Sequence, residues 1–382
     1  MIYLDNAATS WPKPETVYQA VDHCLRYMAA NPGRGSYTMA REAGRILYET
    51  REDLAGLFGV KNATDIAFAY NATDALNMAL LGIIGSGDIV VTTAMEHNAV
   101  TRPLRYLESR GVKLRIVSCD SQGRLIMEEM RDAAKGAKAI VMTHASNVSG
   151  TIMPIAEVAK LAVRENCLMI VDASQTAGRE EIQVDDMKID MLAFSGHKGL
   201  FGPQGTAALY LREGLAVRPL RYGGTGSLSE SDEQPVFMPD RMESGTPNTP
   251  GIAGLGAGIR FIRAVGQANL RKKELALVSA LIKGLQEIPD IVVYGPRKVI
   301  DRTAVVSFTV RGLDSGEVAH RLDRDFGIAC RSGLHCAPWA HRTLGTLETG
   351  TIRLSPGYFN TAAEITETIQ AVESIARRGE KM

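Results

Sequence analysis

The sequence predicts an α/β fold with a large domain built on a mostly parallel sheet, followed by a smaller α+β domain. Two observations support this prediction. Between residues 62 and 211, short apolar runs alternate with helix-like segments, as in parallel sheets that are covered by helices on both faces. Beyond residue 300, isolated strands and helices follow one another without that regular alternation, which is typical of an α+β unit.

The large domain is expected to contain strands at 65–70, 88–92, 113–117, 139–144, 167–171, 191–194 and 207–211, where the apolar runs have the length of buried strands. Helices are expected between them at 73–82, 100–110, 126–134 and 155–165. Because the carboxyl ends of parallel strands meet at one edge of a sheet, functional side chains should lie just after these strands.

Residues 223–250 are polar and rich in Gly and Pro, so we expect a long loop there, and loops of that length are usually functional or disordered. Helices are expected at 252–265 and 270–288. The smaller domain should then contain strands at 304–310, 328–331 and 351–354, and helices at 315–326 and 362–377.

The composition is that of an ordinary soluble chain large enough for more than one domain, with 382 residues, 45% hydrophobic and 23% charged. Basic and acidic residues balance at 43 each, which does not favour nucleic acid or an anionic membrane as partner. The first residues do not have the pattern of a signal peptide, and no apolar run is long enough to span a bilayer. A cytoplasmic location is the default expectation.

The five cysteines are odd in number and include no CxxC pair, so neither a disulfide framework nor a zinc site is expected, and we predict no metal. Four of them have apolar or element-like surroundings, typical of small core residues. Cys336 is the exception.

The most informative stretch is Ser195-Gly-His-Lys198-Gly, where a lysine lies between an apolar run and a glycine-rich turn. Earlier in the chain, a buried-type strand ends on Asp172. Enzymes that use pyridoxal phosphate (PLP) need such a pair: the acid holds the pyridinium nitrogen and the lysine binds the aldehyde covalently. Ser195 and His197 could reach the phosphate. A surface lysine in a glycine loop is the alternative, but Gln175 and the other residues in the same pattern disfavour it.

Three further residues follow predicted strands and have ordinary explanations when taken alone. Thr73 begins a helix, where backbone N–H groups favour a phosphate, although it is equally a plain helix cap. His97 could stack on a ring, but a lone histidine in a loop is usually a satisfied surface group. Asn147 is equally suited to a turn.

Together these motifs resemble those of class V aminotransferase-fold PLP enzymes, and within them the cysteine desulfurases and selenocysteine lyases. The resemblance is carried by segments in the family's order over nearly the whole chain, at residues 3–9, 96–97, 146–150, 172–175, 195–198, 243–248, 331–337 and 353–355. It implies a PLP-dependent transferase type I fold, with a PLP-binding large domain at 16–258 and a small domain formed by 1–15 and 259–382.

The resemblance also implies a role for each matching residue of the cofactor site. Lys198 would bind the aldehyde of PLP, Asp172 the pyridine nitrogen and Gln175 the phenolic oxygen. His97 would stack on the ring and could move protons. The phosphate ligands would be Thr73, Ser195 and His197, joined by Thr246 of the neighbouring subunit, so that a homodimer with shared sites is implied.

The substrate would be a small amino acid whose carboxylate is held by Asn147 and Arg353, and Arg suits this because its planar fork meets a carboxylate bidentately. The segment Arg331-Ser-Gly-Leu-His-Cys336-Ala resembles the sulfur-accepting loop, with Arg331 on the substrate side. The Cys336 thiolate would attack the substrate sulfur and leave alanine and a persulfide, which a sulfur-acceptor protein could collect. We expect His335, beside the thiol, to lower its pKa.

Some features leave alternatives open. Ala72 precedes Thr73, where members of this group often carry two hydroxyl residues, and residues 338–350 are less familiar. The short spacing from Cys336 to Arg353 resembles the group with a small ordered loop, which includes selenocysteine lyases. Other class V reactions, such as transamination or kynureninase-type cleavage, would make Cys336 incidental. A non-catalytic partner protein on the same fold is disfavoured, because Lys198, Asp172 and Arg353 are all present.

Overall fold

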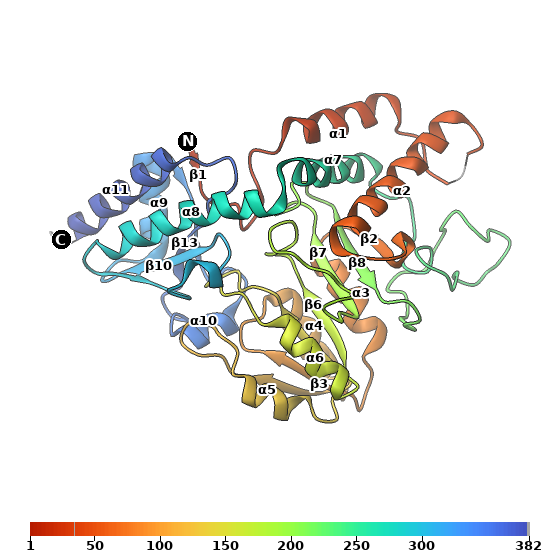
Figure 1. Ribbon diagram of the computed structural model, residues 1–382, viewed down its shortest axis with the longest axis horizontal. Coiled ribbons are helices and arrows are strands. Elements are labelled where there is room, and N and C mark those ends of the chain that lie inside the picture. Colours follow the sequence, from red (N-terminus) through yellow and green to blue (C-terminus); the bar gives the residue numbers. More distant parts are fainter. Residues whose placement is uncertain (34, 380–382) are drawn as a thin grey trace.

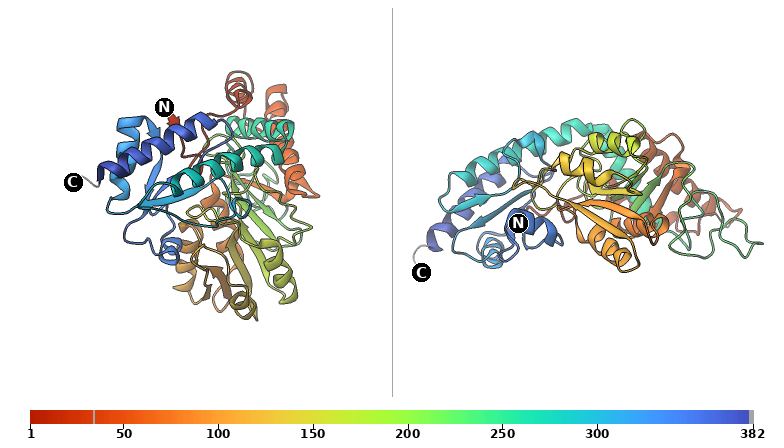
Figure 2. Two further views of the ribbon diagram at one scale, coloured as in Figure 1. Left: turned by 60° about the vertical axis from the view of Figure 1, so that its left-hand side comes forward. Right: turned by 90° about the horizontal axis from the view of Figure 1, so that it is seen from below.

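The computed structural model describes residues 1–33 and 35–379. Figure 1 shows a large sheet with its helices and a smaller body that carries both ends of the chain, with the long helix α8 (Gln267–Gln286) running from one to the other. The right-hand view in Figure 2, seen from below, shows the same elongated arrangement. None of the helices in the described residues is both long and apolar enough to cross a membrane.

The large sheet has seven strands in the order β2-β8-β7-β6-β5-β3-β4. Their bounds lie close to the expected ranges: β2 Ile66–Ala69, β3 Ile89–Thr93, β4 Lys113–Val117, β5 Ala139–Thr143, β6 Leu168–Asp172, β7 Met191–Ser195 and β8 Ala207–Leu211. Every neighbouring pair is parallel except those of β8, which is antiparallel to β2 and β7. A parallel return from β7 would need a crossover connection, and the glycine turn before β8 does not provide one.

Apolar residues on both faces explain why this sheet is buried. Along β5, Ile140 and Met142 belong to one hydrophobic cluster, whereas Ala139 and Val141 belong to another. This alternation is what a strand with a core on each side requires. The first cluster includes side chains of α5 (Met127–Ala134) and α6 (Ile155–Arg164), and the second includes those of α3 (Ala72–Ile83) and α4 (Asn98–Glu108).

Three more helices lie beside the sheet in Figure 1: α1 (Glu15–Tyr27), α2 (Thr38–Phe58) and α7 (Thr249–Val265). Helices α2 and α7 contribute side chains to the first of the two clusters. Both α1 and α2 pack against α7. The sequence analysis expected α7 but not the first two. Residues 223–248 contain no helix or strand, which agrees with the expected loop.

The smaller body is α+β, as expected. Its antiparallel sheet has the order β12-β13-β10-β9, and a parallel pair joins β1 to β11. The elements are β1 Ile2–Tyr3, β9 Ile291–Val293, β10 Val306–Val310, α9 Ser315–Phe326, β11 Ile328–Ala329, β12 Arg331–Gly333, α10 Pro338–Leu344, β13 Thr351–Leu354 and α11 Ala362–Gly379.

One hydrophobic cluster combines Ile2 and Leu4 with side chains of α8, β10, β13 and α11. The first residues of the chain therefore share a core with its last third. Helix α10 behaves differently, because Ala340 and Leu344 belong to the core of the large sheet. The domain limits at 16–258, 1–15 and 259–382 stay a prediction.

Candidate active site

The carboxyl edge of the large sheet opens onto a cavity of about 210 Å³. Asp172 is the last residue of β6 and Ser195 the last of β7, and Lys198 follows in the next turn. The structure brings eight of the predicted site residues to the lining of this cavity: Thr73, His97, Asn147, Asp172, Gln175, Ser195, His197 and Lys198.

The turn that contains Lys198 leaves no space for a side chain at the residue that follows it. A Cβ added at Gly199 would come within 2.3 Å of the Ala177 carbonyl oxygen, so only glycine fits there. Burial lowers the pKa of Lys198 to about 8, helped by the charges of Arg353 and Arg331 and opposed by Asp172 and Asp5. The neutral amine, which is the nucleophilic form, is therefore populated at mildly alkaline pH.

Asp172 is buried, and its orientation is fixed by its own turn. Its Oδ1 accepts hydrogen bonds from the main-chain N–H of Ser174 at 2.9 Å and from the Ser174 hydroxyl at 2.5 Å. The sequence analysis did not assign Ser174 a role, although an aspartate two residues before a serine is a recognisable Asx-turn signal.

His97 is the N-cap of α4 and has one nitrogen already engaged. Its Nδ1 accepts from the Ala99 N–H at 3.0 Å, which assigns the ring proton to Nε2. Burial lowers the pKa of His97 to about 4, with the positive charges of Lys198, Arg331 and Arg353 acting in the same direction and Asp172 opposing them. At neutral pH the ring is uncharged, with an N–H donor on the side away from the helix.

Glu96, just before it, is a supporting residue that the motif contained but the sequence did not explain. Its carboxyl group is buried, accepts the Thr93 hydroxyl at 2.6 Å, and accepts the Thr143 N–H at 3.0 Å. Burial raises the pKa of Glu96 to about 8. Glu96 thus ties the ends of β3 and β5 together under the turn that carries His97.

The lining of the cavity includes the donors that a phosphate requires. Thr73 lies in the first turn of α3, where main-chain N–H groups have no partner within the helix. The Ser195 hydroxyl and Nδ1 of His197 are buried and have no hydrogen-bond partner among the described residues. Buried polar groups are normally paired, so these two atoms fit a ligand with acceptor oxygens. The residues present therefore fit PLP.

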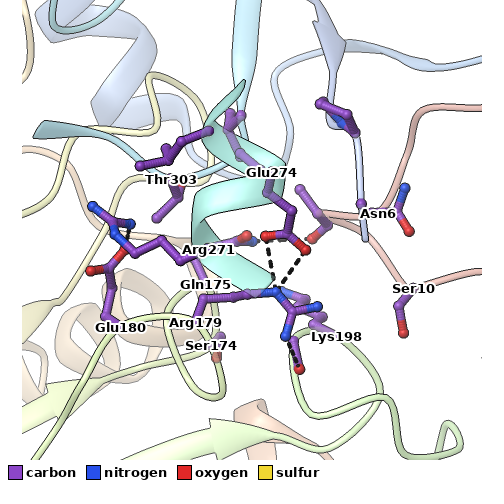
Figure 3. A pocket seen from close by; sticks show the side chains of 17 residues that line it. Asn6, Ser10, Ser174, Gln175, Arg179, Glu180, Lys198, Arg271, Glu274 and Thr303 are labelled. Atoms are coloured by element: carbon purple, nitrogen blue, oxygen red, sulfur yellow. Dashed lines mark hydrogen bonds and ion pairs between the residues drawn. The ribbon is translucent and has the colours of Figure 1, made fainter. Parts of the chain in front are cut away.

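A smaller cavity of about 50 Å³ shares Lys198, Gln175 and Ser174 with the first one (Figure 3). Gln175 also lines it and donates to the Ala7 carbonyl oxygen at 3.1 Å. Arg179 forms an ion pair with Glu274 of α8 at 2.8 Å, and its Nη1 donates to the Gly199 carbonyl oxygen at 2.6 Å. Arg179 therefore anchors the turn after Lys198 to α8, a role that the sequence did not reveal.

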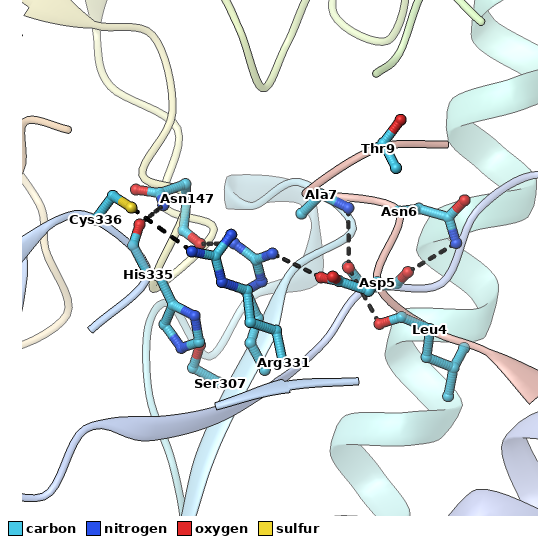
Figure 4. Close-up of polar contacts among 12 residues, drawn as sticks. Leu4, Asp5, Asn6, Ala7, Thr9, Asn147, Ser307, Arg331, His335 and Cys336 are labelled. Atoms are coloured by element: carbon cyan, nitrogen blue, oxygen red, sulfur yellow. Dashed lines mark hydrogen bonds and ion pairs between the residues drawn. The ribbon is translucent and has the colours of Figure 1, made fainter. Parts of the chain in front are cut away.

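A hydrogen bond joins Arg353 of the small body to Asn147, which follows β5 of the large sheet. Figure 4 shows Asn147 and Asp5, the two partners of Arg353. Arg353 is buried on β13, where its Nη2 donates to Asp5 Oδ1 at 2.8 Å and its Nη1 to the Asn147 carbonyl oxygen at 3.1 Å. The Asn147 Nδ2 donates to the His335 carbonyl oxygen at 2.7 Å. Asp5 was not predicted, because it and Arg353 are separated by nearly the whole length of the sequence.

Cys336 is exposed and lies in the small body. Like Arg331 and Arg353, it is not part of the lining of the larger cavity. The Arg331 Nη2 is 3.6 Å from the Cys336 Sγ. The expectation for His335 is wrong. Its ring is buried, bonds through Nε2 to Thr351, and is uncharged because burial lowers its pKa to about 2. The positive group beside the thiol is Arg331.

The structure does not bring Thr246 to the site of its own chain. It is exposed in the loop before α7, where its hydroxyl oxygen accepts from Asn31 Nδ2 at 3.4 Å. It does not line the cavity that contains Lys198. Its proposed contact with the phosphate in a second subunit stays a prediction.

Comparison with known families matches residues 2–367 to the Aminotransferase class-V family. Among curated relatives, a probable cysteine desulfurase of Pyrococcus abyssi is 36% identical and the match covers 99% of this chain and 94% of the relative. A probable cysteine desulfurase of Methanothermobacter thermautotrophicus is 34% identical, covering 99% and 95%. The cysteine desulfurase of Escherichia coli O8 is 31% identical, covering 99% and 94%.

The solved structures agree with this match. The apo cysteine desulfurase from Thermococcus onnurineus NA1 superposes with a TM-score of 0.94 at 36% identity, covering 99% of this chain and 95% of the other. An S-sulfonic acid form of a cysteine desulfurase from Escherichia coli gives a TM-score of 0.87 at 25% identity, covering 99% and 94%. This chain is therefore similar in sequence and in fold to cysteine desulfurases over its whole length.

Proposed function

Because this chain belongs to the Aminotransferase class-V family, we propose that it is a PLP-dependent cysteine desulfurase. It would convert L-cysteine to L-alanine and carry the sulfur as a persulfide on Cys336. The observation that carries the proposal is the exposed Cys336 thiol beside Arg331, in a turn that is hydrogen-bonded to Asn147, which lines the cavity with Lys198 and Asp172. A fold alone does not fix the reaction, so this cysteine is what separates desulfuration from other chemistries of the family.

The cavity residues would hold PLP as the resemblance implies. Lys198 would bind the aldehyde, Asp172 the pyridine nitrogen and Gln175 the phenolic oxygen. His97 would lie against the ring, and Thr73, Ser195 and His197 would take the phosphate. When bound, PLP supplies an electron sink for the bonds that break at the amino acid.

The chain's own groups account for the remaining steps. Arg353 and Asn147 would hold the substrate carboxylate, and the amine of Lys198 would carry a proton between substrate atoms, as its lowered pKa allows. As the Cys336 sulfur bonds to the substrate sulfur, the carbon–sulfur bond of the substrate breaks. One cysteine and one enzyme thiol thus become one alanine and one enzyme persulfide, so atoms and electrons balance.

The test is alanine formation from L-cysteine and, separately, from L-selenocysteine under reducing conditions. Alanine from cysteine at a rate that depends on Cys336 supports the proposal. Alanine from selenocysteine alone would make the protein a selenocysteine lyase. A yellow protein that releases alanine from neither amino acid would contradict the proposal and favour another reaction of the family.

We also propose that the protein works as a two-fold homodimer, with Thr246 reaching the phosphate site of the partner. Large apolar side chains that are exposed on α1, α2 and the loop before α7 support this: Leu25, Tyr27, Tyr37, Tyr48 and Tyr222. A fully active monomer by light scattering at working concentration would contradict it.

The exposure of Cys336 favours delivery of its sulfur to an acceptor protein.

A further inference from the structure

Cys336 lies in a turn whose backbone is unfavourable for its residues. The turn is closed by a hydrogen bond from the Ala337 N–H to the Leu334 carbonyl oxygen at 2.8 Å. Both central residues have positive φ, 49° at His335 and 57° at Cys336. Turns of this kind favour Asn and Gly, and other residues persist in this conformation only where their surroundings hold them there.

Two hydrogen bonds from the large domain hold this turn, one on each central carbonyl oxygen. The Asn147 side-chain amide donates to the His335 carbonyl oxygen at 2.7 Å. The main-chain N–H of Asn98 donates to the Cys336 carbonyl oxygen, also at 2.7 Å. Figure 4 shows Asn147, His335, Cys336 and Arg331 side by side. The conformation of the nucleophile is thus set by groups far away in the sequence.

The Asn98 donor has a particular position in the fold. Asn98 is the first residue of α4, and an N–H at that position has no partner within its own helix. A carbonyl oxygen is a favourable partner there, because a helix N-terminus is electropositive. The residue before it is His97, the N-cap whose ring lines the larger cavity. The same helix end therefore holds the imidazole and the carbonyl group of the nucleophile.

We propose that the first turn of α4 is a latch for the nucleophile, and that Asn98 is a positioning residue through its main-chain N–H. The bond to the Cys336 carbonyl oxygen keeps the turn in its left-handed conformation and the thiol beside Arg331. The effect of this hydrogen bond on catalysis rests on the proposed desulfurase function, whereas its effect on the conformation of the turn does not.

The test compares Asn98→Pro with Asn98→Ala in the PLP-loaded enzyme. Proline removes the N–H but suits the first position of a helix, and the φ of −73° and ψ of 156° at His97 suit a residue before proline. Alanine keeps the N–H. Both variants lose the weak side-chain contact between Thr101 and Asn98 equally, so the pair isolates the main-chain donor.

We expect amide hydrogen exchange in the peptide that spans residues 331–344 to be faster in Asn98→Pro than in Asn98→Ala. Alanine release from L-cysteine should fall by about tenfold or more, since a lost hydrogen bond leaves a carbonyl oxygen unpaired. The visible band of the cofactor and its response to cysteine should not change, so kcat should fall without a matching change in substrate binding. Equal exchange and equal kcat in the two variants would overturn the proposal.

A wild-type measurement covers the case in which Asn98→Pro does not fold. The Asn98 amide should exchange far more slowly than an unstructured peptide, because its hydrogen bond among the described residues is the one to the Cys336 carbonyl oxygen. Exchange at the unstructured rate would overturn the latch. If the wild-type enzyme releases no alanine from cysteine, the desulfurase function fails, but both exchange experiments still decide whether the latch exists.

Discussion

Lys198 follows the end of a central strand, whereas Cys336 lies in a left-handed turn between two strands of the small sheet. The lysine is positioned by the end of β7 and by a turn whose glycines fit tightly against neighbouring backbone and which Arg179 ties to α8. The cysteine is positioned by hydrogen bonds from Asn98 and Asn147. The end of a regular strand therefore places Lys198, whereas hydrogen bonds from distant segments place Cys336. We expect that mutations can affect the two residues separately.

The largest effect should come from Lys198→Ala. Without the amine, the covalent attachment of PLP is lost, so the band near ~420 nm should vanish together with turnover. Absorbance and alanine release measure the two losses in one preparation. A Lys198→Ala protein that still converted cysteine would remove the lysine from the mechanism.

Cys336→Ser and Cys336→Ala should impair the step that depends on the thiol and leave the binding of PLP unchanged. Both variants should keep the cofactor band and its change on adding cysteine, but lose at least ~100-fold of alanine release from cysteine, the scale of a lost nucleophile. Selenium leaves more readily than sulfur, so activity on selenocysteine should fall less. Unchanged release from cysteine would make Cys336 incidental.

The pH dependence of PLP uptake should report the local environment of Lys198. Because its pKa is lowered to about 8 and the neutral amine is the reactive form, uptake by the apoprotein should rise with pH and level off above about 8. An ordinary lysine would go on rising toward pH 10. The rate at which the visible band appears after PLP addition, measured from pH 6 to 10, distinguishes the two profiles.

The smallest effect concerns the strain at Cys336. Glycine tolerates positive φ, so Cys336→Gly should be more stable than Cys336→Ala by roughly 0.5–1 kcal/mol. The matched control is Leu334, which is partly exposed in the same turn and is not among the residues with positive φ. There glycine should be less stable than alanine. The same order at both positions in denaturant titrations would show that the turn is not strained.

The sequence predicted the sheet and its functional edge well, because buried strands and strand-end residues are local signals. Asp172 and Lys198 were found in this way. The antiparallel direction of β8 depends on the connection before it, which the strand pattern does not contain. Helix α1 was missed because apolar residues such as Tyr18, Leu25 and Tyr27 are exposed. Its apolar residues therefore do not form the single buried face from which a helix is recognised in a sequence.

The part of the site around Cys336 could be predicted only in outline. His335 is next to the thiol in sequence, but its ring points into the core, so adjacency was a poor guide. Helix α10 has readable signals, Pro338 at its start and Gly345 at its end, yet its seven residues escaped notice. The hydrogen bonds of Asp5, Asn98 and Arg179 join segments that are distant in the sequence, and no local sequence pattern predicts them.

The pairing of β1 with β11 and of Asp5 with Arg353 has a consequence for biosynthesis. Residues 2–5 leave the ribosome long before residues 328–353 exist, so they must wait unpaired while the large sheet, complete by Leu211, can already form. Arg353 gains its carboxylate partner only when almost the whole chain has been made. The end of the site to which we assign the substrate carboxylate is therefore assembled last, and a nascent chain that stops early would contain the residues around Lys198 but lack Arg353.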